Sequence, residues 1–418
     1  MKLLVFTYAP AGLGHLRVTD ALIASLPKDH PYELLGSDDP LMTRIHRFTS
    51  VNPLARKIYE AFQYGLLEDI FTKLYVWYLR VNVSDVYKKM LQFIDEHSHA
   101  QELTVVATHF GLAHQIASIK NRVRRKTGVK INIVVQVTDD TSQHVWCVRG
   151  SDITFVPSKQ TKDEILSYAS KVGIRLNVEV SPYPNSPALT KLVEEKNARA
   201  SVFVKNSDKV INVIVPISGA AVGLDYLAKL ILEIDRLSKR FHFLVVAKRS
   251  GQTKNFLSKI GRARWVQLIT GRNDNEVVGL YKQTYRENLI HIEITKPSEQ
   301  SFKALIPPSM VGGSILLFTR AIGRQEYDNL SFLRRHHLVE DIDEGGSDTT
   351  ESVYAPRSVM LNEDPMVAAK LVVQSLDTGL FERMTNNFSY SPESMMTSEI
   401  SEKGSWMFWE TLRLMDLI

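Results

Sequence analysis

Short apolar runs alternate along the chain with stretches whose apolar residues recur at helical spacing. In the first half, the runs predict strands at Lys2–Tyr8, Tyr32–Gly36, Leu103–Thr108, Ile131–Val137, Ile153–Val156 and Val178–Ser181. Between them, the periodicity predicts helices at Leu16–Leu26, Leu112–Arg125 and Lys159–Val172. Strands that alternate with helices favour a parallel sheet covered by helices on both faces.

A second series of the same kind follows the proline-rich stretch "SPYPNSPALT" (Ser181–Thr190), which reads as a linker. Its predicted strands are Val210–Pro216, Phe241–Ala247, Trp265–Ile269, Leu289–Ile294 and Ser314–Phe318. Its predicted helices are Ala221–Leu237, Asn275–Gln283, Gln325–Arg335, Pro365–Leu376 and Trp406–Ile418, with an acidic loop at Asp341–Ser358. The pattern therefore predicts two doubly wound, Rossmann-like α/β domains. Ligands bind such sheets at the carboxyl ends of the strands, so two of them facing each other would form a cleft.

The stretch from Leu41 to Ile94 has no obvious strand and fits two inserted amphipathic helices. Within Asn52–Arg80, aromatic residues recur together with Lys and Arg. Either these aromatics are core residues, or they form an apolar acceptor groove or a membrane-facing surface.

Composition is ordinary for a globular protein of 418 residues, with 44% apolar and 23% charged residues. Cys147 is the only cysteine, which excludes an internal disulfide and fits a reducing compartment. No apolar run reaches the roughly 20 residues of a membrane helix. The net charge of +5 is concentrated at Lys120–Lys130, which indicates either an anionic partner or a solvated helix end.

The first strand leads into "AGLGH" (Ala11–His15), where Gly12 and Gly14 would let the backbone approach a ligand. The dinucleotide fingerprint fails because Arg17 stands at the position of its third glycine. An imidazole at a helix N-terminus is favoured in its neutral form and could accept a proton from a hydroxyl. His15 is therefore a candidate base, or else a hydrogen-bonded helix residue.

Five segments in order resemble GT-B glycosyltransferases of the MurG and monogalactosyldiacylglycerol synthase group. They are the strand with "AGLGH", "VVQVTDDTSQHVWCVRGSDITFVPS" (Val134–Ser158), "PISGAAVGLDYLAKLI" (Pro216–Ile231), "ITKPSEQSFKAL" (Ile294–Leu305) and "GRQEYDNLSFL" (Gly323–Leu333). The first loop has one glycine fewer than some members, and Ala304–Leu305 replaces the family's Glu-Ala.

This resemblance implies an acceptor-binding domain at residues 1–187, a nucleotide-sugar domain at 205–378, and C-terminal helices at 379–418 that pack back on the first domain. It implies that His15 is the base or an acceptor contact, and that Asp139 orients His15 or the acceptor. For the donor it implies Gly219 and Gly223 at the diphosphate and Ser298, Glu299 and Gln300 at the phosphates or ribose. Gln325, Glu326 and Asn329 would hold the donor sugar hydroxyls.

The expected function is an inverting transfer of a sugar from a UDP-sugar to an acceptor hydroxyl, on a lipid at a membrane surface. The resemblance implies no cofactor and no metal, and a cytoplasmic protein, peripheral on the inner face of the membrane. The expected partners are the nucleotide sugar, the lipid and an anionic membrane, with no nucleic acid. Two alternatives stay open: a nucleotide-sugar epimerase on the same fold, and a catalytically inactive protein that binds sugar nucleotides or lipids.

Overall fold

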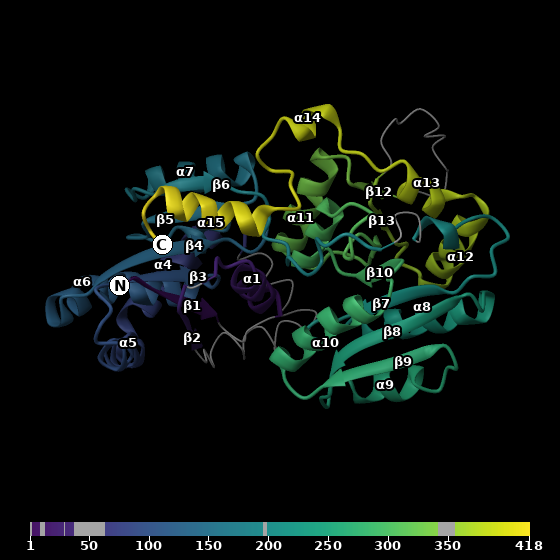
Figure 1. Cartoon of the computed structure of the whole chain (residues 1–418), viewed down its shortest axis with the longest axis horizontal. Coiled ribbons are helices and arrows are strands. Elements are labelled where there is room, and N and C mark those ends of the chain that lie inside the picture. Colours follow the sequence, from purple (N-terminus) through teal and green to yellow (C-terminus); the bar gives the residue numbers. More distant parts are fainter. Residues whose placement is uncertain (1, 9–12, 29, 37–62, 195–198, 342–355) are drawn as a thin grey trace. The chain divides into compact units, whose positions relative to one another are not determined.

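The computed structural model describes residues 2–8, 13–28, 30–36, 63–194, 199–341 and 356–418. The chain forms two compact units (Figure 1). Unit 1 comprises Met1–Pro184 and Lys403–Ile418, and unit 2 comprises Asn185–Glu402.

Unit 1 is built on a parallel sheet, which within the described residues has the order β2-β1-β3-β4-β5-β6. The strands are β1 (Lys2–Tyr8), β2 (Tyr32–Gly36), β3 (Glu102–Ala107), β4 (Lys130–Gln136), β5 (Ile153–Val156) and β6 (Val178–Val180). Each strand predicted for this half is confirmed to within one residue at either end. The apolar runs of β1, β3, β4 and β5 are buried in the sheet, whereas β2 lies at its edge with Tyr32 and Leu34 exposed.

Helices cover both faces of this sheet. They are α1 (Leu13–Ala24), α4 (Gly65–Val81), α5 (Ser84–Glu96), α6 (Phe110–Thr127), the 3₁₀ turn η1 (His144–Trp146), α7 (Lys159–Lys171) and α15 (Gly404–Leu414). Helices α4 to α7 share one core with the sheet. On α15, Trp409 donates its indole N–H to the Leu22 carbonyl of α1 at 3.0 Å, and the Phe408 ring lies 4.8 Å from Phe155 of β5.

Unit 2 holds a second parallel sheet, with the order β12-β13-β11-β10-β7-β8-β9 among the described strands. They are β7 (Ile211–Pro216), β8 (Phe241–Lys248), β9 (Val266–Gly271), β10 (Ile292–Thr295), β11 (Ile315–Phe318), β12 (Val339–Asp341) and β13 (Ser358–Met360). The five predicted strands are present. Strands β12 and β13 were not predicted, because three residues are too few for a periodic signal.

Its helical elements are η2 (Ala200–Val202), α8 (Leu224–Leu237), α9 (Lys254–Ile260), α10 (Asp274–Glu287), η3 (Glu299–Leu305), α11 (Arg324–Arg335), α12 (Pro365–Asp377), α13 (Leu380–Asn386) and α14 (Pro392–Met395). Helices α8, α9, α12 and α13 pack in one core with the sheet. Buried Lys303 ties η3 to the sheet, because its ammonium pairs with Glu293 of β10 and contacts the Tyr281 hydroxyl. Helix α9 was not predicted from the sequence.

The unit boundaries differ from the expected ones. The first crossing of the chain lies between Pro184 and Asn185 rather than between residues 187 and 205. Residues 379–402, expected with the first domain, belong to unit 2, because Phe381 and Met384 of α13 are buried in its core. Only the stretch from Lys403 returns to unit 1.

Candidate functional site

His15 lies in the first turn of α1, which begins at Leu13 rather than at the expected Leu16. Gly14 is therefore a helical residue and not part of the loop. The helix starts early because Leu13 is itself buried in unit 1 and extends the apolar face. Gly12, the other expected loop glycine, lies outside the described residues.

The orientation of the His15 ring is fixed by the residue that follows β3. His15 Nδ1 lies 2.6 Å from the carbonyl oxygen of Thr108. Because a carbonyl only accepts hydrogen bonds, Nδ1 carries the proton, and in the neutral ring the lone pair is on Nε2. The Thr19 hydroxyl braces this arrangement, since it lies 2.7 Å from the Thr108 hydroxyl and donates to the His15 carbonyl at 2.9 Å.

Asp139 lies close to His15 through a residue that sequence reasoning missed. The Thr138 hydroxyl is 3.4 Å from His15 Nδ1 and 3.3 Å from Asp139 Oδ2. Strands β1, β3 and β4 are neighbours in the sheet, so their carboxyl ends bring α1, Thr108 and Thr138 together. The sequence did carry a signal for these residues, because Thr108 and Thr138 each directly follow a buried apolar run.

Aromatic rings surround this side of His15. The His109 ring meets it edge to face at a centroid distance of 5.2 Å, and the Trp146 ring lies 6.3 Å away. Trp146 is fully buried, and its indole N–H has no hydrogen-bond partner among the described residues.

In unit 2, the expected donor residues follow β7, β10 and β11, which are consecutive in the sheet order β11-β10-β7. Gly219 and Gly223 lie in the turn between β7 and α8. Gly223 has φ +77°, a backbone conformation that favours glycine, although a Cβ there would meet nothing within 4 Å. The Ser218 hydroxyl of this turn is buried and has no protein partner in the described part of the chain.

The turn after β10 runs into η3. Ser298 immediately precedes η3, and Glu299 beside it is half-buried, whereas Gln300 is buried. Ala304, which stands at the family's ribose-binding glutamate, is fully buried in η3. Of the expected set, Ser298 and Glu299 therefore keep partial access to solvent.

The turn after β11 is pinned to the turn after β10. Glu326 forms an ion pair with Lys296 and accepts a hydrogen bond from the Ile322 backbone at 2.6 Å. Burial raises the pKa of Glu326, although Lys296 opposes this shift. The fully buried Asn329 donates to the Pro297 carbonyl at 3.2 Å. Gln325 is half-buried at the start of α11. The observed contacts of Glu326 and Asn329 are structural, and the sugar-binding roles of all three residues stay predictions.

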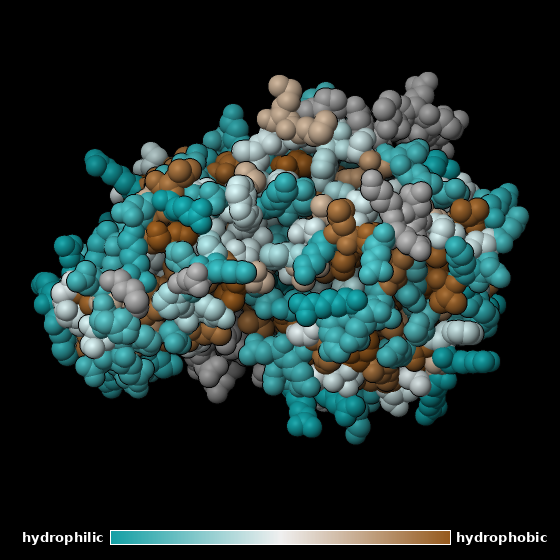
Figure 2. Space-filling view, viewed as in Figure 1, coloured by the Kyte–Doolittle hydropathy of each residue, from teal (hydrophilic) through white to brown (hydrophobic). Residues whose placement is uncertain are grey.

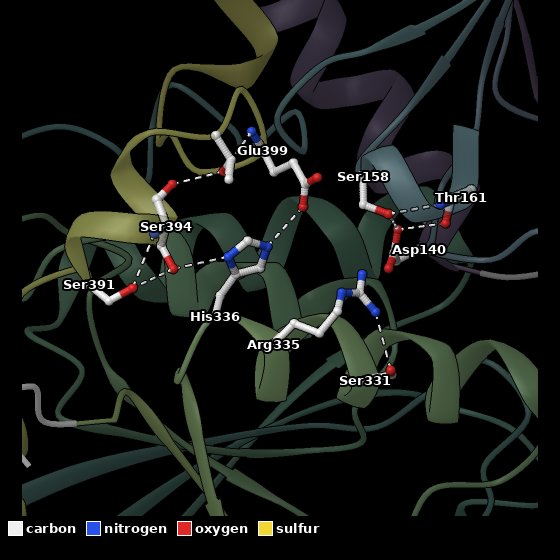
Figure 3. A network of polar contacts seen from close by, with 10 residues as sticks. Asp140, Ser158, Thr161, Ser331, Arg335, His336, Ser391, Ser394 and Glu399 are labelled. Carbon is white, nitrogen blue, oxygen red and sulfur yellow. Dashed lines mark hydrogen bonds and ion pairs between the residues drawn. The ribbon is translucent and has the colours of Figure 1, made fainter. Parts of the chain in front are cut away.

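Each unit also contains one further polar network that stabilises its fold. In unit 2, Figure 3 shows His336 at the end of α11, between Ser394 at 3.1 Å and Glu399 at 2.9 Å. In unit 1, buried Asp140 accepts hydrogen bonds from Ser158 and Thr161 at the start of α7. Asp140 therefore holds the hydroxyl of Ser158, which caps α7 by accepting from the Thr161 backbone N–H at 3.1 Å.

Helix α4 buries its acidic residues and exposes apolar ones. Glu68 accepts from the His144 backbone at 2.9 Å, and Asp69 pairs with His144 at 2.9 Å and with Lys171 at 2.8 Å. The outer face consists of Leu66, Ile70, Leu74, Trp77 and Val81, spaced three or four residues apart. Leu74 is 63% exposed and Trp77 is 65% exposed. In the aromatic segment Asn52–Arg80, residues 52–62 lie outside the described residues; of the rest, Tyr75 is a core residue and Trp77 faces outward, so the groove or membrane role of the outer face stays a prediction.

None of the helices in the described part of the chain combines the length and apolarity of a membrane span. Among the same residues, no three His, Cys or acidic side chains gather in a metal-binding group. The expectation of a metal-independent, cofactor-free protein stays a prediction.

The fold is shared with known sugar-nucleotide proteins. S. aureus MnaA in complex with UDP is 11% identical, with a TM-score of 0.53 over 100% of this chain and 98% of that one. The UDP-GlcNAc 2-epimerase of Neisseria meningitidis bound to UDP-GlcNAc is 12% identical, with a TM-score of 0.51 over 99% and 100%. Anabaena HepE in complex with UDP and glucose is 12% identical, with a TM-score of 0.50 over 99% and 100%.

No protein-family model matches the sequence, and neither does any curated protein. At such low identities the structural likeness shows the fold alone. The expected fold class is confirmed: the chain has the two Rossmann-like α/β domains of the GT-B fold.

Proposed function

We propose that this protein is a glycosyltransferase that moves a sugar from a UDP-sugar to the hydroxyl of a lipid acceptor, with inversion at the anomeric carbon. The observation that carries the proposal is the fixed His15 ring, whose Nδ1 donates to Thr108 at 2.6 Å. A ring held in this tautomer offers Nε2 as a base.

In the proposed reaction, His15 Nε2 takes the proton of the acceptor hydroxyl. The acceptor oxygen forms a bond to the anomeric carbon while the bond from that carbon to the diphosphate oxygen breaks, and UDP leaves with the bonding electrons. Thr138 links His15 to Asp139, whose negative charge favours the protonated ring that results. Asp139 is thus a positioning residue in this proposal.

The donor part of the proposal rests on the carboxyl edge of the unit 2 sheet. The turn of Gly219 and Gly223 leads into the 14-residue helix α8, whose N-terminus favours a negative charge. The Ser218 hydroxyl of this turn is buried and has no partner among the residues that the structure describes. Lys296 follows β10, the neighbour of β7, and lies at the same edge, where it is already paired with Glu326. These features fit a diphosphate leaving group stabilised mainly by backbone amides.

The lipid part of the proposal rests on α4. Its outer face is apolar and carries Lys73, while both of its acidic residues, Glu68 and Asp69, are buried. An apolar helix face with basic and no acidic exposed residues is typical of helices that lie in the interface of an anionic membrane. An epimerase has no large acceptor to accommodate, so this surface favours the transferase over the epimerase.

The experiment measures release of nucleotide and transfer of sugar from UDP-, GDP- and TDP-sugars in the presence of mixed lipid vesicles. We expect lipid-dependent turnover of a UDP-sugar by the wild type. His15→Ala should lower the rate by about 10²–10⁴-fold, the usual contribution of a general base. His99→Ala, which removes an exposed histidine of the same unit, serves as the matched control and should leave the rate unchanged.

Other outcomes would replace the proposal. Conversion of the donor sugar to its epimer without any lipid would identify an epimerase. Saturable UDP binding without turnover, equal in wild type and His15→Ala, would identify a binding protein and remove His15 from a catalytic role.

A further inference from the structure

The edge of unit 2 formed by β8, α9 and β9 carries a concentration of positive charge. Residues 248–272 contain seven Lys and Arg and no Asp or Glu. Lys248 pairs with Asp274 at 3.0 Å. The remaining six cations are exposed, and none of them forms an ion pair within the described part of the chain. They are Arg249, Lys254, Lys259, Arg262, Arg264 and Arg272. We call these six residues the cationic edge.

The fold spreads these charges along one side of the sheet. Strand β9 is the last strand of the sheet order and pairs with β8. Arg249 and Arg272 follow the carboxyl ends of β8 and β9, and the Arg249 amide donates to the Gly271 carbonyl at 2.9 Å. Arg262 and Arg264 precede the other end of β9, about 20 Å away for a six-residue strand. Hydrophilic side chains project along the lower right margin of Figure 2, where Figure 1 draws α9 and β9.

A comparison with the basic stretch at Lys120–Lys130 shows why the cationic edge is distinctive. There, Lys120 pairs with Asp152 at 3.2 Å and Lys130 pairs with Glu102 at 2.8 Å. That stretch is therefore partly neutralised within unit 1. Two of the six cations at Lys120–Lys130 are paired in this way, whereas only Lys248 of the seven cations at residues 248–272 is paired within the described part of the chain, so more charge is available there to an external anion.

We propose that the cationic edge is a docking surface for an anionic lipid bilayer. Phosphate-bearing headgroups would match its charges, since Arg in particular binds phosphate through paired N–H groups. The edge also carries apolar atoms: Leu268 of β9 is 37% exposed, and Arg264 stacks over the Trp265 ring at 5.4 Å. A bilayer interface accommodates both charge and apolar side chains, whereas a nucleic acid backbone would use the charge alone. The inference concerns binding and does not require the proposed chemistry.

The test is cosedimentation of the full-length protein with vesicles of phosphatidylcholine containing 30% phosphatidylserine, and with pure phosphatidylcholine. The double variant Arg262→Glu/Arg264→Glu should bind the anionic vesicles at least tenfold more weakly at about 100 mM salt, since each cation contributes to such binding. Wild-type binding should fall as salt rises. The matched control Lys205→Glu/Lys370→Glu changes two exposed lysines of unit 2 outside the cationic edge by the same charge, and should bind like the wild type.

Unchanged vesicle binding by the cationic-edge variant would overturn the inference. So would an equal loss in the control, which would indicate net charge rather than a surface. If the variant loses binding to labelled duplex DNA but keeps vesicle binding, the edge is a nucleic-acid surface instead. Lys254→Gln/Lys259→Gln on α9 provides a milder second variant should the reversal impair folding. Sugar transfer to a detergent-dispersed acceptor, measured in parallel, reports on the proposed function separately.

Discussion

Helices α4 and α8 are two long helices, one in each unit, and they differ in what most of their inward-facing side chains are. Helix α8 turns Leu227, Leu230, Ile231 and Ile234 inward, as a helix covering a parallel sheet normally does. Helix α4 turns Glu68, Asp69 and Thr72 inward in its first half and leaves Ile70, Leu74 and Trp77 outside.

The difference shows that hydrophobic periodicity identifies a helix without identifying its buried face. The inner face of α4 meets His144 and Lys171, so its carboxylates find partners there. The inner face of α8 meets the apolar core of unit 2. In α4 the charged residues are buried against their partners, so the apolar face is exposed to solvent. Such an exposed apolar face is a candidate interaction surface.

The largest expected effect is a difference in stability between two matched Leu→Ala substitutions, one in α8 and one in α4. Leu230→Ala in α8 should lower the free energy of unfolding by about 2–5 kcal/mol, because Leu230 is fully buried. The matched change Leu74→Ala in α4 should alter it by less than about 0.5 kcal/mol, because Leu74 is exposed. Chemical denaturation measures both, and Leu74→Ala should also weaken vesicle binding. A large destabilisation by Leu74→Ala would mean that the outer face of α4 is covered within the protein.

The second largest expected effect is a loss of stability when Asp69, on the inner face of α4, is replaced. Asp69→Asn should cost about 1–3 kcal/mol, because it weakens the contacts to His144 and Lys171. The hydrogen bond from Lys171 lowers the pKa of Asp69 below its usual 3.8. The stability that Asp69 contributes is therefore present above pH 4 and is lost as the pH falls through the lowered value. Thermal unfolding between pH 7 and pH 3 should show a shallower acid decline in Asp69→Asn, and an unchanged decline would contradict the role given to the pair.

The smallest effect should come from the buried acid of α8. Glu233 pairs with Arg236 one turn along the same helix at 2.6 Å, and this hydrogen bond lowers the pKa of Glu233. Because Arg236 is largely exposed, water replaces the lost contact, and Glu233→Gln should change the melting temperature less than Asp69→Asn does. A larger change in Glu233→Gln would show that α8 depends on its acid as α4 does.

The candidate site was predictable in part. The resemblance to GT-B glycosyltransferases pointed to candidate residues that follow β1, β4, β7, β10 and β11. It did not predict that Thr108 fixes the His15 ring, because that contact joins residues 93 positions apart. Nor did it predict that Glu326 and Asn329 hold the turn at Lys296 and Pro297.

The sequence by itself determined the two series of strands and helices, since buried parallel strands leave continuous apolar runs that need no tertiary information. It also determined the charge-poor and charge-rich stretches, including residues 248–272. Only the tertiary structure decided which charges remain available. Lys120 and Lys130 meet carboxylates from distant strands and loops, whereas Arg262 and Arg264 meet none in the described chain. The same holds for α4, because the partners of Glu68 and Asp69 come from residues more than 70 positions away.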